Sequence, residues 1–387
     1  MKFDRTRRAL LQAAAIAIAS RSSAWALAQD EELVDFADLD GFKTESSARN
    51  PRIKFFDLRR LTAWKTPENE FFSFHQTEAA QVDVASWLLK VGGFVEKPLQ
   101  LTLDQLRRRP DRREMAVTIE CSGNAAGPAA NGMISNGVWT GVGLRSILEE
   151  AKLKPEAREI AFFGMDRERD RTSGMIAPHG RSVYVQDALE PNVMLAFELN
   201  GKPLPLERGY PVRVILPGWY GMTHIKWLSG IEVLDRRYEG THMSRNYHTI
   251  HAASDNDDQV IMESAITRTR LKSVVARVTR RRSAYKISGA AWGGPSPIKA
   301  VEVSVNGGPW RAARIDDRGD NTASGPFAWV LWSLDWSDAV SGTHTLISRA
   351  IDDQGRIQPT LQELRRDVKS VREDNSQWPR KIVLTEI

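Results

Sequence analysis

Residues 116–124 read AVTIECSGN, and this stretch places the only cysteine of the chain directly after a predicted strand. The run from Ala116 to Ile119 is apolar or β-branched, which is typical of a short strand. The residues that follow Cys121, SGNAAGP over 122–128, can continue neither a helix nor a strand. The pattern therefore predicts a cysteine presented on a loop at the end of a strand.

A single cysteine among 387 residues rules out an intramolecular disulfide, so the fold must be held together by its hydrophobic core. Two roles are open for such a thiol. It is either a small buried hydrophobe, which is the commoner fate of a lone cysteine, or a soft ligand for a metal.

Strands and helices are mixed on both sides of this loop. Apolar runs predict strands over 87–91, 160–163 and 212–217, and Thr102 is placed to cap a helix start. Leu144, Ile147, Leu148 and Ala151 have the spacing of a buried helix face. We therefore expect a mixed α+β fold for this part of the chain.

From about residue 260 the pattern changes to alternation with a period of two. Val301, Val303 and Val305 point to one face, and the sequence NGG over 306–308 supplies a hairpin turn. The alternation returns over 327–336 and 343–351. This predicts a separate all-β sandwich of the immunoglobulin-like kind, for which about 100 residues suffice.

Composition and charge exclude two classes of function. Hydrophobic residues make up 41% and charged residues 27%, without an apolar run of transmembrane length, so we expect a soluble protein with no membrane span. The net charge of +5 falls to +1 without the first 28 residues. The basic runs at 107–109 and 280–282 lack interleaved aromatic residues, which argues against nucleic-acid binding.

The first 28 residues have the pattern of an export signal. A basic start precedes an apolar stretch over 9–19, and Ala26-Leu27-Ala28 forms a cleavage pattern. Residues 6–12, TRRALLQ, resemble the twin-arginine signal, an address for proteins exported already folded. We expect a periplasmic protein exported by this route; an ordinary secretory leader is the alternative.

Four phrases resemble the sulfite oxidase family of molybdenum enzymes: TIECSGN over 118–124, GYPVRV over 209–214, PGWYG over 217–221 and IKWL over 225–228. The resemblance implies molybdenum and molybdopterin as cofactors and Cys121 as the metal ligand and a catalytic residue. It also implies a sulfite-oxidase-type mixed α+β molybdopterin domain over 45–255, followed by an immunoglobulin-like dimerisation domain over 260–387. A homodimeric oxidoreductase that transfers an oxygen atom follows from the same resemblance.

The resemblance also assigns a pocket for the pterin and its phosphate, and His75 as an aid to proton transfer. The implied cofactor-binding residues are Phe72, Ser73, Phe74, His75, Gln76, Cys121, Asp166, Arg208, Arg213, His224, Ile225 and Lys226. Taken singly, Arg213 is equally well a paired strand residue. Lys226 and His224 fit surface groups, and Asp166 fits a turn residue in a charged loop.

The chain departs from the family where a sulfite-binding site needs cations and a tyrosine. The phrase that usually reads FFxRxH is FFSFHQ over 71–76, with Phe74 at the arginine and Gln76 at the histidine, although a slip of one residue restores His75 to that role. Ala125 and Ala126 replace paired arginines, Phe197 replaces a tyrosine and Val330 replaces a further arginine.

These departures predict a substrate that is less charged than sulfite, such as a sulfoxide or another oxygen acceptor. Oxidation of sulfite to sulfate is the alternative enzymatic function, and a non-catalytic exported binding protein is the alternative of another class. The chain has no haem attachment motif, so we expect electrons to pass through a separate partner, such as a c-type cytochrome.

Overall fold

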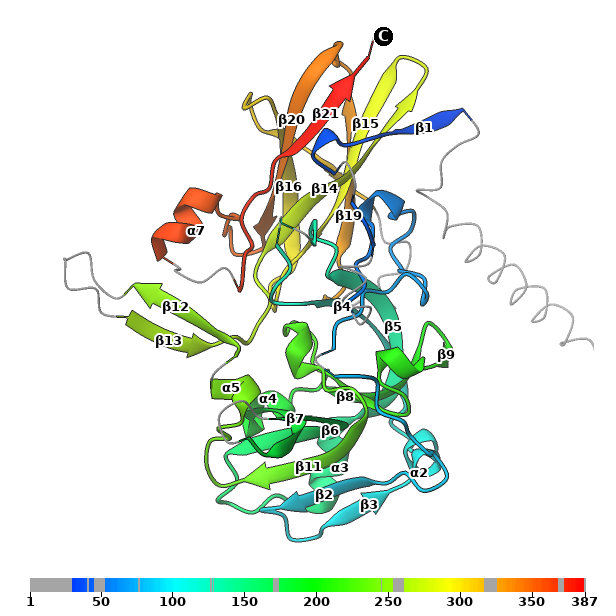
Figure 1. Cartoon of the computed structure of the whole chain (residues 1–387), viewed down its shortest axis with the longest axis vertical. Coiled ribbons are helices and arrows are strands. Elements are labelled where there is room, and N and C mark those ends of the chain that lie inside the picture. The colour runs from blue at the N-terminus through cyan, green and yellow to red at the C-terminus, as the bar shows by residue number, and fades with distance from the viewer. Residues whose placement is uncertain are drawn as a thin grey trace, which may run out of the picture.

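The computed structural model describes residues 30–39, 42–44, 53–75, 77–125, 127, 129–169, 174–244, 246–252, 261–316, 326–367 and 372–385. The predicted leader over 1–28, Gln76 and Ala126 lie outside these residues. Figure 1 shows an elongated molecule, with β2 to β11 at one end and β14 to β21 at the other. Within the described ranges, no helix combines the length and the apolar character that crossing a bilayer requires.

Two five-stranded sheets form the mixed α+β part of the molecule. The first has the order β3-β2-β11-β6-β7, with β2 and β11 parallel and the other pairs antiparallel. Its strands are β2 (Leu89–Gly93), β3 (Leu99–Leu101), β6 (Glu159–Arg169), β7 (Ile176–Tyr184) and β11 (Leu228–Leu234). The second has the order β10-β8-β5-β4, with β9 beside β8. Its strands are β4 (Arg113–Glu120), β5 (Ile134–Gly143), β8 (Met194–Leu199), β9 (Lys202–Pro203) and β10 (Arg213–Ile215).

Short helices connect these strands, and the two that the sequence predicts are confirmed. The side chain of Thr102 caps α2 (Leu103–Arg107) by accepting a hydrogen bond from the backbone N–H of Gln105, and the side chain of Gln105 accepts one from the backbone N–H of Thr102. In α3 (Leu144–Ala151) the four residues with helical spacing are all fully buried. The remaining helical segments of this part are α4 (Val185–Ala188), α5 (Thr241–Ser244), and the 3-10 helices η3 (Leu206–Arg208) and η4 (Gly221–Thr223).

The C-terminal part is an antiparallel sandwich, as predicted. One sheet has the order β1-β14-β15-β19-β18 and the other β17-β16-β20-β21. The strands are β14 (Lys272–Arg281), β15 (Ala284–Trp292), β16 (Ile298–Val305), β17 (Arg311–Ala312), β18 (Arg314–Ile315), β19 (Val330–Trp336), β20 (Gly342–Asp352) and β21 (Arg380–Leu384). The predicted turn after β16 is confirmed, because Asn306 and Gly307 have φ of 53° and 71°, the left-handed values that a tight hairpin needs.

One strand of this sandwich comes from the other end of the chain. β1 (Glu31–Val34) pairs with β14, and the 3-10 helix η1 (Ala37–Leu39) packs on β21. Outside the two sandwich sheets lie the 3-10 helix η2 (Leu58–Arg60), the helix α7 (Leu361–Asp367) and the hairpin of β12 (His248–Ala252) and β13 (Ile261–Ala265).

The two parts share a hydrophobic cluster where they meet. It combines side chains from the N-terminal segment and β5 with side chains from β14, β15, β19 and the residue just before β19: Phe56, Leu58, Leu61, Ile134, Val274, Ala276, Ala290, Trp292, Trp329 and Leu331. Full burial of one such large side chain contributes about 1.5–3 kcal/mol. The sandwich therefore packs against the start of β5, which pairs with the end of β4, where Cys121 lies.

Candidate functional site

Cys121 lies at the C-terminal end of β4, in a short closed loop. Its backbone N–H donates to the carbonyl of Met133 at 2.9 Å, and its carbonyl accepts from the backbone N–H of Asn124 at 2.9 Å. The side chain is half-buried, and burial raises the pKa of the thiol to about 11. Without a metal the group is a neutral thiol at pH 7, whereas a bound metal takes the thiolate form.

Cys121 lines a partly open cavity, the kind of concave site in which proteins bind small molecules and cofactors. Every cofactor-binding residue predicted from the sequence lines this cavity, except Gln76, which is not among the described residues: Phe72, Ser73, Phe74, His75, Cys121, Asp166, Arg208, Arg213, His224, Ile225 and Lys226. The fold thus brings five separate segments of the chain to one cavity.

Three cations line the cavity, and burial makes each of them costly. Arg208 donates to the carbonyls of Phe71 and Phe72, the latter at 2.9 Å. Burial lowers the pKa of Arg208 to about 10 and, with the charge of Arg208 adding to the effect, that of Arg213 to about 9. Burial followed by the two arginine charges lowers the pKa of Lys226 well below its ordinary value. An anion in this cavity would relieve all three penalties.

Two buried nitrogens beside these cations have no hydrogen-bond partner within the described structure. Nε of Arg213 is one, although its other nitrogens donate to the carbonyls of Arg208 and His224 at 3.0 and 3.1 Å. Nδ1 of His224 is the other, because Nε2 of that ring lies 3.1 Å from the carbonyl of Trp219 and must carry the proton. Burial lowers the pKa of His224 to about 3, so its ring is neutral and Nδ1 is a bare acceptor.

An unsatisfied donor and an unsatisfied acceptor in a cation-lined cavity fit a polar heterocycle that carries a phosphate. Asp166 adds a carboxylate. Burial raises its pKa, although the charge of Lys226 partly opposes this effect. Asp166 packs over Gly164, where a Cβ atom would lie only 2.2 Å from its Oδ1. The residues present therefore suit a pterin with a phosphate tail.

His75 is held in one orientation along the cavity. Its Nδ1 lies 3.2 Å from the carbonyl of Thr77, and its Nε2 lies 3.1 Å from the hydroxyl of Ser73. Because a carbonyl only accepts, the proton of the neutral ring belongs on Nδ1, and Nε2 accepts from Ser73. The ring also meets Trp227 edge to face, with centroids 5.6 Å apart.

The cavity also contains residues that sequence reasoning missed: Phe71, Ile119, His179, Glu207, Gly221, Met222, Trp227 and Tyr247. Phe71, Ile119, Gly221 and Trp227 lie inside quoted phrases and could have been found there. His179 on β7 and Tyr247 before β12 come from stretches without any local signal. Only the fold carries them to the cavity.

Glu168, His179 and His242 have ligand atoms within 4.8 Å of one another and could in principle hold a cation. Burial, with the charges of His242, Lys226 and Arg181, lowers the pKa of His179 well below its ordinary value. The positive neighbours that produce this shift also oppose a bound cation. A hydrogen bond between Nε2 of His242 and the carboxylate of Glu168 already accounts for that contact.

Three of the described positions where the sequence departs from the family do not line the cavity: Ala125, Phe197 and Val330. Phe197 is fully buried in the core of the α+β part, and Val330 is buried in the core of the sandwich. Their identities therefore do not set the charge of the cavity directly. Phe197 stands at the family's tyrosine position, and the cavity has a tyrosine, Tyr247, from another segment. Phe74 remains a cavity residue.

Comparison with known families decides the assignment. Residues 75–242 match the oxidoreductase molybdopterin binding domain, and residues 257–385 match the Mo-co oxidoreductase dimerisation domain. The chain belongs to the sulfite oxidase family of molybdopterin oxidoreductases. As a member of this family it is an enzyme whose cofactor is molybdopterin, and the alternative of a non-catalytic binding protein is not supported.

The chain matches different relatives over different shares of their length. It is 31% identical over 355 residues to mitochondrial sulfite oxidase of Homo sapiens, covering 81% of this chain and 63% of that protein. It is 28% identical over 323 residues to sulfite oxidase of Gallus gallus, covering 76% of this chain and 68% of that protein. The crystal structure of the sulfane dehydrogenase SoxCD from Paracoccus pantotrophus superposes with a TM-score of 0.74 and 27% identity, covering 91% of this chain and 90% of that chain. The chain thus spans less than two thirds of the human protein and nine tenths of the sulfane dehydrogenase chain.

Proposed function

We propose that this enzyme transfers an oxygen atom between water and a sulfur compound that carries less negative charge than sulfite, at a molybdenum centre ligated by Cys121. The observation that carries the substrate class is Phe74, an aromatic side chain lining the cavity where the family phrase has an arginine. Molybdenum bound to the pterin would supply the oxygen-atom transfer, in which two electrons and two protons move with each oxygen.

Cations and apolar groups of the cavity have different roles in this proposal. Arg208, Arg213 and Lys226 are the set that suits the phosphate and ring of the cofactor. The lining also includes apolar groups, among them Phe74 and Ile119, which lies two residues before Cys121, and Gly221 of η4 packs against Ile119. A dianion needs several converging cations, whereas a neutral sulfur compound does not.

The likeness to the sulfane dehydrogenase supports the same class of substrate, since that structure matches over nine tenths of both chains. Sulfane sulfur is one substrate of the class, and a sulfoxide is another. His75, with Nε2 facing the Ser73 hydroxyl, is our proposed group for proton transfer during turnover.

Sulfite itself is the second candidate, and one observation favours it. The guanidinium of Arg372, from the C-terminal part, lies 5.7 Å from the ring centroid of Tyr247, and its charge lowers the pKa of Cys121 against the effect of burial. Arg372 is therefore a cation near the sulfur that could take the place of an absent family arginine.

Steady-state assays on the holoenzyme decide between the two. Sulfite, a neutral dialkyl sulfoxide and a sulfane compound are compared, with artificial electron acceptors for oxidation and artificial donors for reduction. We expect kcat/KM for the sulfane or the sulfoxide to exceed that for sulfite. A sulfite kcat/KM above about 10⁴ M⁻¹s⁻¹, the lower end of ordinary enzymes, would establish sulfite as the substrate instead.

Metal analysis tests the role of Cys121 independently of the substrate. Protein from a host that makes the cofactor should contain about one molybdenum per chain, and the Cys121→Ser protein should fold but lose molybdenum-dependent activity. A Cys121→Ser protein with unchanged activity would contradict ligation by this sulfur.

The remaining assignments follow from the proposed chemistry. Export by the twin-arginine route would let the cofactor be inserted before the folded protein reaches the periplasm. A c-type cytochrome or another separate redox partner would exchange the electrons. The dimerisation domain supports a homodimer, which light scattering of the purified protein tests.

A further inference from the structure

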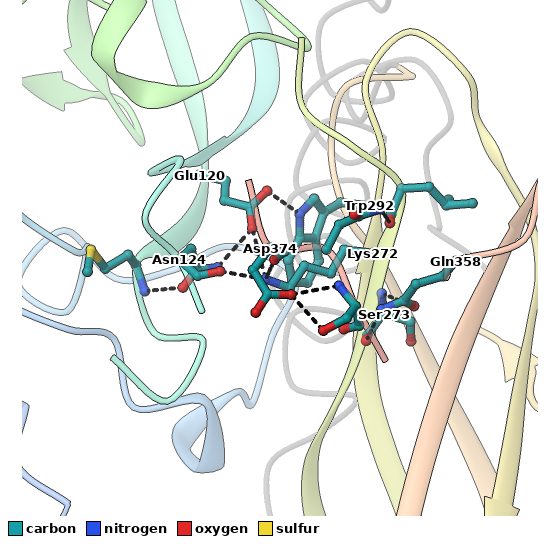
Figure 2. A network of polar contacts seen from close by, with 11 residues as sticks. Glu120, Asn124, Lys272, Ser273, Trp292, Gln358 and Asp374 are labelled. Atoms are coloured by element: carbon teal, nitrogen blue, oxygen red, sulfur yellow. Dashed lines mark hydrogen bonds and ion pairs between the residues drawn. The ribbon is translucent and has the colours of Figure 1, made fainter. Parts of the chain in front are cut away.

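The loop that presents Cys121 is held in place by the C-terminal sandwich. Lys272, the first residue of β14, is 1% exposed, and its ammonium donates to the carbonyls of Asn124 and Asp374 at 2.6 and 2.7 Å. Nζ also lies 3.5 Å from Oε1 of Glu120. An ammonium has three N–H donors, so these three acceptors use all of them. Figure 2 shows this arrangement, with Lys272 reaching from its strand between Glu120 and Asp374.

Glu120, which directly precedes Cys121, is held from a second strand as well. It is 2% exposed, and its Oε2 accepts from the indole N–H of Trp292, at the end of β15, at 2.8 Å. Its Oε1 accepts from the side-chain amide of Asn124 at 2.9 Å. Asn124 in turn accepts from the backbone N–H of Met133 at 2.9 Å. Residues on both sides of Cys121 are therefore tied to β14 and β15 (Figure 2).

Stability alone is a weak explanation for this arrangement. A buried ion pair is often replaced by apolar side chains without loss of stability, whereas removal of one partner leaves a costly unpaired charge. The pair thus makes one loop conformation much more favourable than others without necessarily stabilising the fold. The conformation that it selects is the one that presents the sulfur of Cys121 to the cavity.

We infer that Lys272 and Trp292 are positioning residues for the molybdenum centre, which fix the loop of Cys121 through Glu120 and Asn124. The inference rests on the proposed ligation of molybdenum by Cys121. The C-terminal sandwich then holds the metal ligand in place, in addition to providing a dimerisation domain. Such groups behind a ligand orient it before the metal arrives and tune the metal afterwards.

The chain offers a matched pair of variants for the test. Trp292→Phe removes the indole N–H that holds Glu120. Trp329→Phe is the control, because Trp329 is also fully buried at the domain junction, and its indole N–H donates to the carbonyl of Trp64 at 2.6 Å and not to the loop of Cys121. Lys272→Met is the third variant. If it does not fold, the double variant Glu120→Gln/Lys272→Met, which removes both charges, is measured in its place.

The first readout is alkylation of the cofactor-free protein by iodoacetamide, which reports on Cys121 directly because the chain has no other cysteine. We expect Trp292→Phe and the Lys272 variant to react at least about tenfold faster than Trp329→Phe, equivalent to about 1.4 kcal/mol in the free energy of loop opening. The second readout is the Mo(V) electron paramagnetic resonance spectrum of the loaded protein. We expect the g values to shift in both test variants and to stay at wild-type values in the control.

Faster alkylation together with shifted g values supports the inference. An alkylation rate within twofold of the control, or a wild-type Mo(V) spectrum in both test variants, overturns it. Failure of the proposed function looks different, because the Cys121→Ser protein would then keep its molybdenum and its activity, whatever the alkylation rates are.

Discussion

Replacing Arg213 with methionine should leave the stability of the cofactor-free protein nearly unchanged while strongly weakening cofactor binding. Arg213 is 6% exposed on β10, where it donates to two backbone carbonyls and keeps Nε without a partner within the described structure. The substitution keeps most of the side-chain volume and removes the charge and all donors. Measuring stability and cofactor binding separately therefore distinguishes a structural role of Arg213 from a role in cofactor binding.

The expected effect on stability follows from two opposing contributions. Burial lowers the pKa of Arg213 from 12.5 to about 9, which corresponds to roughly 5 kcal/mol against the charged form in the folded protein. Its two charged hydrogen bonds contribute about 1.5–3 kcal/mol each in the other direction. The contributions nearly cancel, so we expect the free energy of unfolding to change by less than about 2 kcal/mol.

In cofactor binding, no opposing contribution offsets the loss of the Arg213 charge. Loss of one charged hydrogen bond to the phosphate or ring, about 1.5–3 kcal/mol, weakens binding by about 10- to 150-fold. Urea unfolding of the protein made without cofactor measures the first quantity. Molybdenum and pterin content of protein from a cofactor-competent host measures the second.

Arg277→Met is the control for this experiment. Arg277 is 3% exposed, donates to the carbonyl of Leu61 at 2.9 Å and has its pKa lowered by burial, but it does not line the cavity. We expect the control to keep its cofactor. Full cofactor content in Arg213→Met, or a loss of more than about 4 kcal/mol of stability without cofactor, would refute the assignment of Arg213.

Three further predictions follow from the cavity. His224 has a folded pKa of about 3 and an ordinary value of 6.5, so acidification protonates the unfolded chain first and removes stability as the pH falls from 6.5. Urea unfolding should show His224→Gln losing about 3 kcal/mol less than wild type between pH 6.5 and pH 4, and parallel pH profiles would contradict this. Phe74→Arg adds a cation to the cavity and should raise kcat/KM for sulfite at least about tenfold in the steady-state assay. An unchanged value would show that Phe74 does not determine which substrate the enzyme accepts. Gly164→Ala would place a Cβ 2.2 Å from the Asp166 carboxylate. We expect thermal unfolding to show a loss of about 1–3 kcal/mol of stability, and we expect the cofactor content of the protein to fall as well. Wild-type values in both measurements would show that Asp166 can move away freely.

Much of the local structure could be predicted because it is set by neighbouring residues. The helix cap at Thr102, the buried face of α3 and the turn at Asn306 each depend on residues at most seven positions apart. Short-range spacing and turn chemistry are sufficient for such features.

The errors lie where contacts join distant parts of the chain. Phe197 stands at a tyrosine position of the family phrase, yet β8 carries it into the hydrophobic core, and Tyr247 reaches the cavity from a stretch without any local signal. β1 joins the C-terminal sheet by pairing with β14, more than 240 residues away. No local periodicity encodes such pairings, because a strand pattern shows which face is buried but not its partner.

The amino-acid sequence by itself determined that the only cysteine follows a strand, that a β sandwich follows an α+β part, and which residues carry the family's phrases. Only the tertiary structure decided that these phrases share one cavity, that His179 and Tyr247 complete it, and that Lys272 and Trp292 hold the loop of Cys121. The reason is that hydrophobic patterning acts over a few residues. The partners of a buried polar group are set by how whole sheets pack.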